Sequence, residues 1–397
     1  MIQVYYDPTK KNWYHQLQSQ KFTWGKEKKV ISYFGGNVKT MLPFSISENS
    51  GRLSPIVGIL AGNSKTKTTF SGNAATFIRI QKELEKQGSL CVVFTPSSVG
   101  ASEVNGFYYL RKVKKWVRIK TPLPDIVYNR IPYRKMEKDF DYSQLLTLLE
   151  QKNIPYFNPS FFSKWSVYQS LRQNPKIQSY LPDTTLYSLD SLIMMIEKYK
   201  CVYLKSDQGH KGKGLFRIRK HNHGFSLASL DQQLHFNSLI ELDNYLGPFL
   251  EKDKYLVQES IVSDTFESKR YDIRILVHLS HDNHYRISGT GIRLSGKNDL
   301  TTHVPNGGKI ISLSIVEDRI NEKLLSNIVE EIGHQLSKDL KASIGEFSVD
   351  IGKTPKNDYY IFEVNSKPMV FDEPHIRNDG LANLIAFLIT QAKDYQN

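Results

Sequence analysis

The sequence predicts a protein of mixed α/β and α+β class, with two or three compact units. Its 397 residues exceed the usual length of one compact domain. An apolar run at 56–60, a helical pattern over 74–87 that stops before Gly88, and an apolar run at 91–94 together predict a βαβ unit. Strands and helices then alternate along the rest of the chain, which closes on an amphipathic helical pattern at 379–395.

Three segments can be separated along the chain. Residues 1–55 mix short β-like runs with glycine turns, so we expect a small β-rich N-terminal segment. Residues 56–158 continue from the βαβ unit through a strand at 124–130 and are expected to form an α/β domain. A proline-containing stretch around Asn158 marks the join to the last segment, 159–397.

The composition indicates a folded chain with a large positive charge. Hydrophobic residues make up 40% and charged residues 23%, and the net charge is +13. The basic residues are spread along the chain, and their densest run, 111–120, is predicted to be a β-hairpin around Lys114 and Lys115. The positive charge is diffuse, and the sequence contains no motif of a known nucleic-acid-binding domain. The sequence therefore argues against a nucleic-acid partner.

The sequence also argues against a membrane partner. No apolar run is long enough to span a bilayer, and the first residues lack the apolar stretch of a signal peptide. The two cysteines, Cys91 and Cys201, lie in separate apolar runs and suit a reducing compartment. We therefore expect a cytoplasmic protein.

A glycine-rich turn follows a strand that ends in lysine. The strand at 201–205 closes on Lys205, and residues 206–214 then contain three glycines together with Lys211 and Lys213. Such a turn can fold over phosphates, with backbone N–H groups and lysines as donors. A hairpin tip with solvated lysines would have the same composition, so this motif alone leaves both interpretations open.

A β-hairpin with oxygen-bearing side chains is predicted at 345–352 and 359–365. Residues two apart share a face, so Glu363 and Asn365 should project together with Asp350 beside them, and Phe362 and Val364 should take the opposite face. Such groups on an otherwise apolar hairpin favour a Mg²⁺ site over an exposed strand face.

Charged residues also interrupt other apolar strands. Gln258 and Glu259 lie in one strand, and Asp272 and Arg274 lie in the next. Arg130 ends the strand at 124–130, where α/β sheets place ligands. An arginine that pairs with a nearby carboxylate would fit the same position, so both roles stay open for Arg130.

The order of these motifs resembles the ATP-grasp superfamily, and more closely the spore-coat-associated YheC/YheD family. Segments 125–130, 272–274 and 363–368 carry the closer resemblance, which extends over roughly residues 56 to 390. It implies an ATP-grasp fold, in which two α+β subdomains clasp ATP, preceded by a pre-ATP-grasp α/β domain.

The resemblance also implies an activity. Members join a carboxylate to an amine with ATP and two Mg²⁺ ions, through an acyl phosphate, and release ADP and phosphate. Two alternatives stay open: a non-catalytic nucleotide-binding protein of spore-coat assembly, and an ATP-grasp kinase. The family association adds an expected link to the spore.

Site residues follow from the resemblance position by position. The phosphates of ATP would be held by Lys164, Lys205, Lys211 and Lys213. Glu259 and Ser260 would meet the adenine, between Gln258 and Ile261, and Asp272 would bind the ribose. Arg274 and Arg293 would act in catalysis on the transferring phosphoryl group, and Asp350, Glu363 and Asn365 would bind magnesium.

The substrate side carries one departure from the family pattern. Where relatives have an asparagine four residues before a Gly-Gly pair, this chain has His303, with Asn306 directly before Gly307. Together with Arg130 and Lys367, these residues are the expected substrate contacts. Only some of the basic residues are needed to bind the phosphates of ATP. The remaining positive charge predicts an acidic amino acid or peptide as substrate.

Overall fold

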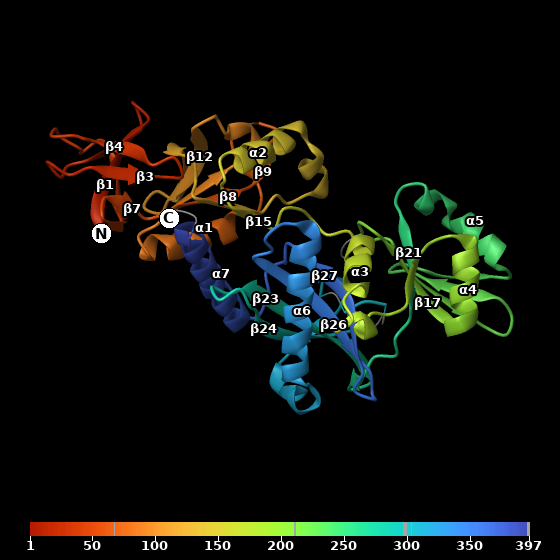
Figure 1. Ribbon diagram of the computed structural model, residues 1–397. Helices are drawn as coiled ribbons and strands as arrows, with labels where there is room; N and C mark the ends of the chain where they lie inside the picture. Colours follow the sequence, from red (N-terminus) through yellow and green to blue (C-terminus); the bar gives the residue numbers. More distant parts are fainter. Residues whose placement is uncertain (67, 210–211, 297–299, 303, 395–397) are drawn as a thin grey trace.

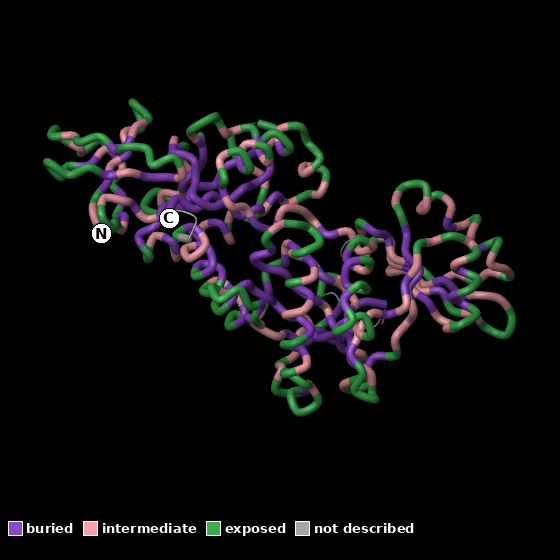
Figure 2. Tube along the Cα trace, viewed as in Figure 1, coloured by how far each residue is buried: buried purple, intermediate pink, exposed green. Residues whose placement is uncertain are grey.

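The computed structural model describes residues 1–66, 68–209, 212–296, 300–302 and 304–394 (Figure 1). The N-terminal strands lie at one end of the molecule, a unit containing β17, β21, α4 and α5 lies at the other, and the sheet containing β23 and β26 lies between them. Buried residues follow the strands of these sheets, and exposed residues gather in the turns (Figure 2). Among the described residues, no helix is both long and apolar enough to cross a membrane.

The first sheet is formed by the N-terminal residues and has the order β5-β1-β2-β4-β3-β7-β6. Its strands are β1 (Ile2–Asp7), β2 (Asn12–His15), β3 (Phe22–Trp24), β4 (Lys29–Tyr33), β5 (Leu42–Ile46), β6 (Glu48–Asn49) and β7 (Arg52–Leu53). Alternation along these strands buries Trp13, Trp24 and Phe44, whose rings make edge contacts at about 4.9 Å between centroids. The same core includes Leu90 and Val92 of the next sheet.

The second sheet contains the predicted βαβ unit and has the order β13-β12-β11-β8-β14-β15. Its strands are β8 (Ile56–Leu60), β11 (Leu90–Phe94), β12 (Glu103–Leu110), β13 (Lys115–Pro122), β14 (Ile126–Asn129) and β15 (Tyr156–Phe157), with a separate small pair, β9 (Gly62–Asn63) and β10 (Phe70–Ser71). The helices are α1 (Ala74–Lys86) and α2 (Phe140–Gln151). The predicted basic hairpin is confirmed as β12 and β13, with Lys114 in the turn at φ 52°.

The third sheet has the order β16-β21-β17-β18-β19-β20 and packs against two helices. The elements are β16 (Thr184–Leu186), β17 (Cys201–Ser206), β18 (Leu215–Lys220), β19 (Phe225–Ala228), β20 (Gln233–Phe236), β21 (Tyr255–Glu259), α4 (Leu189–Tyr199) and α5 (Leu239–Leu250). On β17, Val202 and Leu204 are buried in the core shared with these helices. The alternate residues, Tyr203 and Lys205, are therefore left to the other face of the sheet.

The fourth sheet has the order β25-β24-β23-β26-β27, with β22 paired to β23. The elements are β22 (Thr265–Phe266), β23 (Lys269–Leu279), β24 (Tyr285–Leu294), β25 (Lys309–Ile311), β26 (Glu346–Lys353), β27 (Tyr359–Asn365), α3 (Lys164–Arg172), α6 (Glu322–Leu340) and α7 (Pro374–Asp394). The predicted acidic hairpin is confirmed as β26 and β27. The last helix begins at Pro374, five residues before the predicted start at Asp379. A proline is compatible with the first turn of a helix, where no backbone N–H is required.

Candidate active site

A cavity of about 350 Å³ lies between the third and fourth sheets. Its walls come from β17 and β21 on one side and from β23, β24, β26 and β27 on the other. Of the residues predicted from the sequence, those that line it are Lys205, Gln258, Glu259, Ile261, Asp272, Arg274, Arg293, Asp350 and Glu363. Residues from distant parts of the chain thus meet at one concave surface.

The alternation of β23 explains how three charged side chains reach the cavity. Tyr271, Ile273 and Ile275 are fully buried in the core. The residues that alternate with them, Arg270, Asp272 and Arg274, share the other face of the strand and line the cavity. Arg270 was not predicted as a site residue, although its spacing from Asp272 and Arg274 was the signal that could have found it.

A β-bulge changes which residues of the acidic hairpin face the cavity. Asp350 lies opposite Glu363, but Ile351 lies opposite Ile361, so Phe362 has no partner on β26. Phe362 therefore lines the cavity together with Glu363. The prediction that Phe362 lies on the opposite face is wrong, because strict alternation does not hold across a bulge.

The two carboxylates of the hairpin face basic side chains. Glu363 lies 3.2 Å from Lys164 Nζ, and Asp350 lies 3.5 Å from Arg274 Nη1. Burial favours the neutral form of Glu363, but Lys164, Lys205 and Arg274 outweigh it and lower the pKa of the carboxyl group. The Glu363 carboxylate is thus an acceptor-only group, and oxygen ligands of this kind are suited to a divalent cation.

Lys205 and Lys164 connect the cavity to the glycine-rich turn. Burial lowers the pKa of Lys205 to about 8, although the charge of Glu363 acts in the opposite sense. The Lys205 ammonium donates to Gln258, and Lys164 donates to the carbonyl of Gly209 at 2.6 Å. Lys164 opens α3, whose first turn is capped by Ser163. Lysines at the edge of a cavity can supply the positive charge that phosphate groups require.

Two buried polar atoms at the cavity lack partners among the described residues. Asp272 accepts a hydrogen bond from the Thr302 hydroxyl at 2.6 Å through one oxygen, while its other oxygen, Oδ1, has no partner. The Nε of Arg270 is also buried without one. An unsatisfied buried polar atom costs about 1–3 kcal/mol. A polar ligand with hydroxyl and phosphate groups would satisfy both, so the donor and acceptor set fits ATP.

The remaining predicted residues lie around the cavity or outside the described part of the chain. Lys213 is exposed in the glycine-rich turn, and Asn306 approaches that turn at Gly212, whose φ is 77°. Ser260 follows β21, Asn365 ends β27, and Gly307 follows Asn306 at φ 90°, but none of them lines the cavity. Lys211 and His303 lie outside the described residues.

Arg130 and Lys367 are paired within the protein. Arg130 Nη1 lies 2.9 Å from Glu346, and its Nη2 donates to the Pro368 carbonyl at 3.0 Å. Lys367 pairs with Glu137, and burial lowers the pKa of its ammonium to about 8. Neither side chain lines the cavity between the two sheets.

The fold and the cavity define an ATP-grasp protein. Residues 153–392 match the family described as YheC/D like ATP-grasp, and the chain therefore belongs to this family. The ATP-grasp fold and the resemblance to the YheC/YheD proteins are thus confirmed.

Individual relatives agree with this assignment. The chain is 27% identical over 361 residues to the endospore coat-associated protein YheD of Bacillus subtilis (strain 168), a match that covers 86% of this chain and 79% of the relative. D-alanyl-alanine synthetase A from Vibrio cholerae O1 biovar eltor str. N16961 superposes with a TM-score of 0.53 at 12% identity, over 86% of this chain and 98% of that one. At this identity, the second likeness concerns the fold alone.

Proposed function

We propose that this protein is an ATP-dependent ligase that joins a carboxylate to an amine. The observation that carries the proposal is the charge arrangement of the cavity: Lys205, Arg270 and Arg274 lie on the same concave surface as the carboxylates of Asp350 and Glu363. Cations on both sheets can hold a triphosphate, and carboxylates beside them can hold the Mg²⁺ that accompanies it.

The residues of the chain have separate tasks in this proposal. Lys164 and Lys205 would bind phosphate oxygens, and Asp272 would accept hydrogen bonds from the ribose. Asp350 and Glu363, with Asn365 at the end of the same strand, would hold Mg²⁺, which offsets the charge of the transferring phosphoryl group when bound. Arg274 and Arg293 would stabilise that charge from the fourth sheet.

The reaction needs no protein nucleophile. An oxygen of the substrate carboxylate would attack the γ-phosphorus and release ADP, which forms an acyl phosphate. The amine nitrogen would then attack the acyl carbon, the C–N bond would form, phosphate would leave, and the nitrogen would lose a proton. The apolar side chains of Leu215, Ile261 and Phe362 line the same cavity and would limit the access of water that hydrolyses the acyl phosphate.

Two parts of the proposal are more specific: the association with the spore and the type of reaction. The name of the Bacillus subtilis relative supports an association with the endospore coat. Product analysis separates ligation from the two alternatives: an amide together with ADP and phosphate indicates the ligase, a phosphorylated hydroxyl indicates a kinase, and nucleotide binding without turnover indicates an assembly protein.

ATP with Mg²⁺ is expected to raise the melting temperature of the protein. A ligand that binds only the folded state stabilises it by about 2.7 kcal/mol at a concentration 100 times its Kd. Thermal unfolding should be followed with ATP and Mg²⁺, with ATP and EDTA, and with Mg²⁺ alone, and the first condition should give the largest shift. An unchanged melting temperature at millimolar ATP and Mg²⁺ would contradict nucleotide binding.

An acidic acceptor is expected to react with a higher kcat/KM than a neutral one, and this preference should weaken with salt. The support is the net charge of +13 and the exposed lysines Lys112, Lys114 and Lys115 at the end of the β12–β13 hairpin. Screening over about 8 Å at physiological ionic strength should reduce the preference. The measurement compares acidic and neutral acceptors of equal length at low and physiological salt, in wild type and in Lys112→Gln/Lys114→Gln. Equal use of both acceptors at low salt would overturn this part of the proposal.

A further inference from the structure

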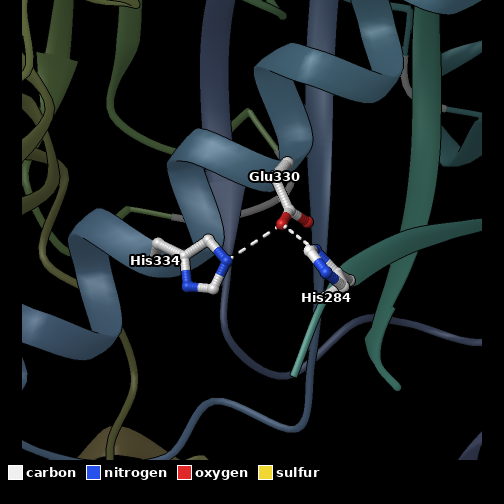
Figure 3. Close-up of side chains that lie close together, drawn as sticks. All are labelled: His284, Glu330 and His334. Atoms are coloured by element: carbon white, nitrogen blue, oxygen red, sulfur yellow. Dashed lines mark hydrogen bonds and ion pairs between the residues drawn. The ribbon is translucent and has the colours of Figure 1, made fainter. Parts of the chain in front are cut away.

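A cluster of two histidines and one glutamate lies away from the ATP cavity. Glu330 and His334 are four residues apart on α6, so they share one face of the helix, and His284 lies in the turn between β23 and β24 (Figure 3). Because a strand rises about 3.3 Å per residue, this turn is roughly 20 Å along β23 from Asp272. The cluster therefore shares no residue with the nucleotide site.

The three side chains converge on one point. His284 Nδ1 lies 2.7 Å from Glu330 Oε1, and His334 Nε2 lies 3.0 Å from the same oxygen. One ligand atom from each residue lies within 4.8 Å of the other two. Figure 3 shows both imidazole rings directed at the carboxylate from different elements.

The surrounding structure fixes the positions of the three residues. The second oxygen of Glu330, Oε2, accepts a hydrogen bond from the backbone N–H of Tyr285 at 2.5 Å. The turn that carries His284 is closed by Ser280, whose backbone N–H and hydroxyl both donate to the His284 carbonyl, at 2.8 and 2.6 Å. Such secondary hydrogen bonds orient a ligand before a metal binds.

The close packing of α6 on the hairpin depends on Gly333. A Cβ atom at this position would lie 2.3 Å from the Tyr285 ring, so only glycine lets the helix approach this closely. The His334 ring also makes an edge contact with Tyr285, at 5.2 Å between centroids. The separation of the two backbone segments that carry Glu330 and His284 is thus set by the core.

We propose that His284, Glu330 and His334 form a binding site for a divalent transition metal ion of the Zn²⁺ type. Two imidazole nitrogens and one carboxylate oxygen are ligands that Zn²⁺ takes, and a fourth position would be left to water. Ligand atoms around a tetrahedral Zn²⁺ lie about 3.3 Å apart, given bonds of about 2.0–2.1 Å. The two observed nitrogen–oxygen separations, 2.7 and 3.0 Å, are close to this value, and the imidazoles have room to rotate because the side chains of His284 and His334 are 61% and 43% exposed.

The ion would connect α6 to the β23–β24 hairpin. It replaces the two hydrogen bonds that Glu330 accepts from the imidazoles with three coordinate bonds. Because β23 and β24 carry Asp272, Arg274 and Arg293, the metal would stabilise the sheet behind the nucleotide site without touching it.

The test is isothermal titration of the full-length protein with ZnCl₂. It is best made in a Glu363→Gln background, which weakens any binding of Zn²⁺ by the carboxylates of the cavity. His281→Ala is the matched control, since His281 is exposed in the same turn but does not belong to the cluster. The test variants are His284→Ala, His334→Ala and Glu330→Gln.

One Zn²⁺ per chain is expected in the parent and in His281→Ala, with binding weakened about tenfold or more in each test variant. Zn²⁺ should raise the melting temperature of the parent and of the control but not of the test variants. Mg²⁺ should not compete, because imidazole nitrogens are poor ligands for it. A parent that takes up no Zn²⁺, or test variants that bind it as tightly as the parent, would overturn the proposal and leave the cluster as a carboxylate hydrogen-bonded to two imidazoles.

Discussion

Glu363→Gln is expected to reduce turnover by about 1,000-fold or more while the protein stays folded, because a group that organises the transferring phosphoryl charge contributes on this scale. The substitution removes a charge from the cavity without changing the size of the side chain. It also leaves Lys164 and Lys205 without the carboxylate that faces them. Both lysines stay in place, and the phosphates of bound ATP supply negative charge where Glu363 no longer does, so binding of ATP should change much less than turnover.

The measurement compares ADP release and nucleotide affinity in the same preparations. Glu317→Gln is a matched control, because Glu317 is exposed in a short 3-10 helix (Glu317–Arg319) and does not line the cavity. The control should keep the activity of the wild type. If Glu363→Gln turned over at the wild-type rate, the assignment of the magnesium site to this hairpin would be wrong.

The part of the fold that could be predicted consists of features that are read directly along the sequence, namely the alternation within strands and the order of the elements. The strands that contain Lys205 and Asp272 follow the period of two, and the order of the motifs along the chain resembled the ATP-grasp family. The family match over residues 153–392 confirms that resemblance.

What the sequence did not predict depends on contacts between distant residues. The bulge that turns Phe362 into the cavity is set by the register of β26 and β27, which no spacing within one strand reveals. Thr302, which donates to Asp272, lies in a loop and belongs to no motif. His284 and Glu330 are separated by 46 residues and meet only because α6 packs on the hairpin.

Arg130 illustrates a choice that the sequence left open. Its position at the end of β14 suited both a substrate contact and a structural pair. In the structure, its guanidinium pairs with Glu346 of β26, and the same carboxylate lies 3.3 Å from His278 Nε2 and accepts from Tyr128. The side chains of Arg130 and Glu346 are 13% and 8% exposed, so this group links the second and fourth sheets away from water.

Arg130→Ala is expected to destabilise the protein by about 3 kcal/mol, because removing one partner of a buried ion pair leaves the other charge without compensation. Burial favours the neutral form of Glu346, but the neighbouring His278 and the charge of Arg130 outweigh burial and lower its pKa. The stability that Glu346 contributes is therefore present above its ordinary pKa of 4.5 and is lost as the pH falls through the lower value of the folded state. This acid-dependent loss should be smaller in Arg130→Ala.

Urea unfolding at neutral and acid pH measures both effects. Arg79→Ala is the matched control: Arg79 also links two units, by a hydrogen bond of 3.2 Å to Asn378, but it is exposed, and its loss should cost about 0.5 kcal/mol or less. The double variant Arg130→Ala/Glu346→Gln should regain part of the lost stability, because no buried charge is left unpaired. If Arg130→Ala were as stable as the control and yet lost activity toward an acidic acceptor, the guanidinium would act on the substrate and the pair with Glu346 would be the resting arrangement of a binding residue.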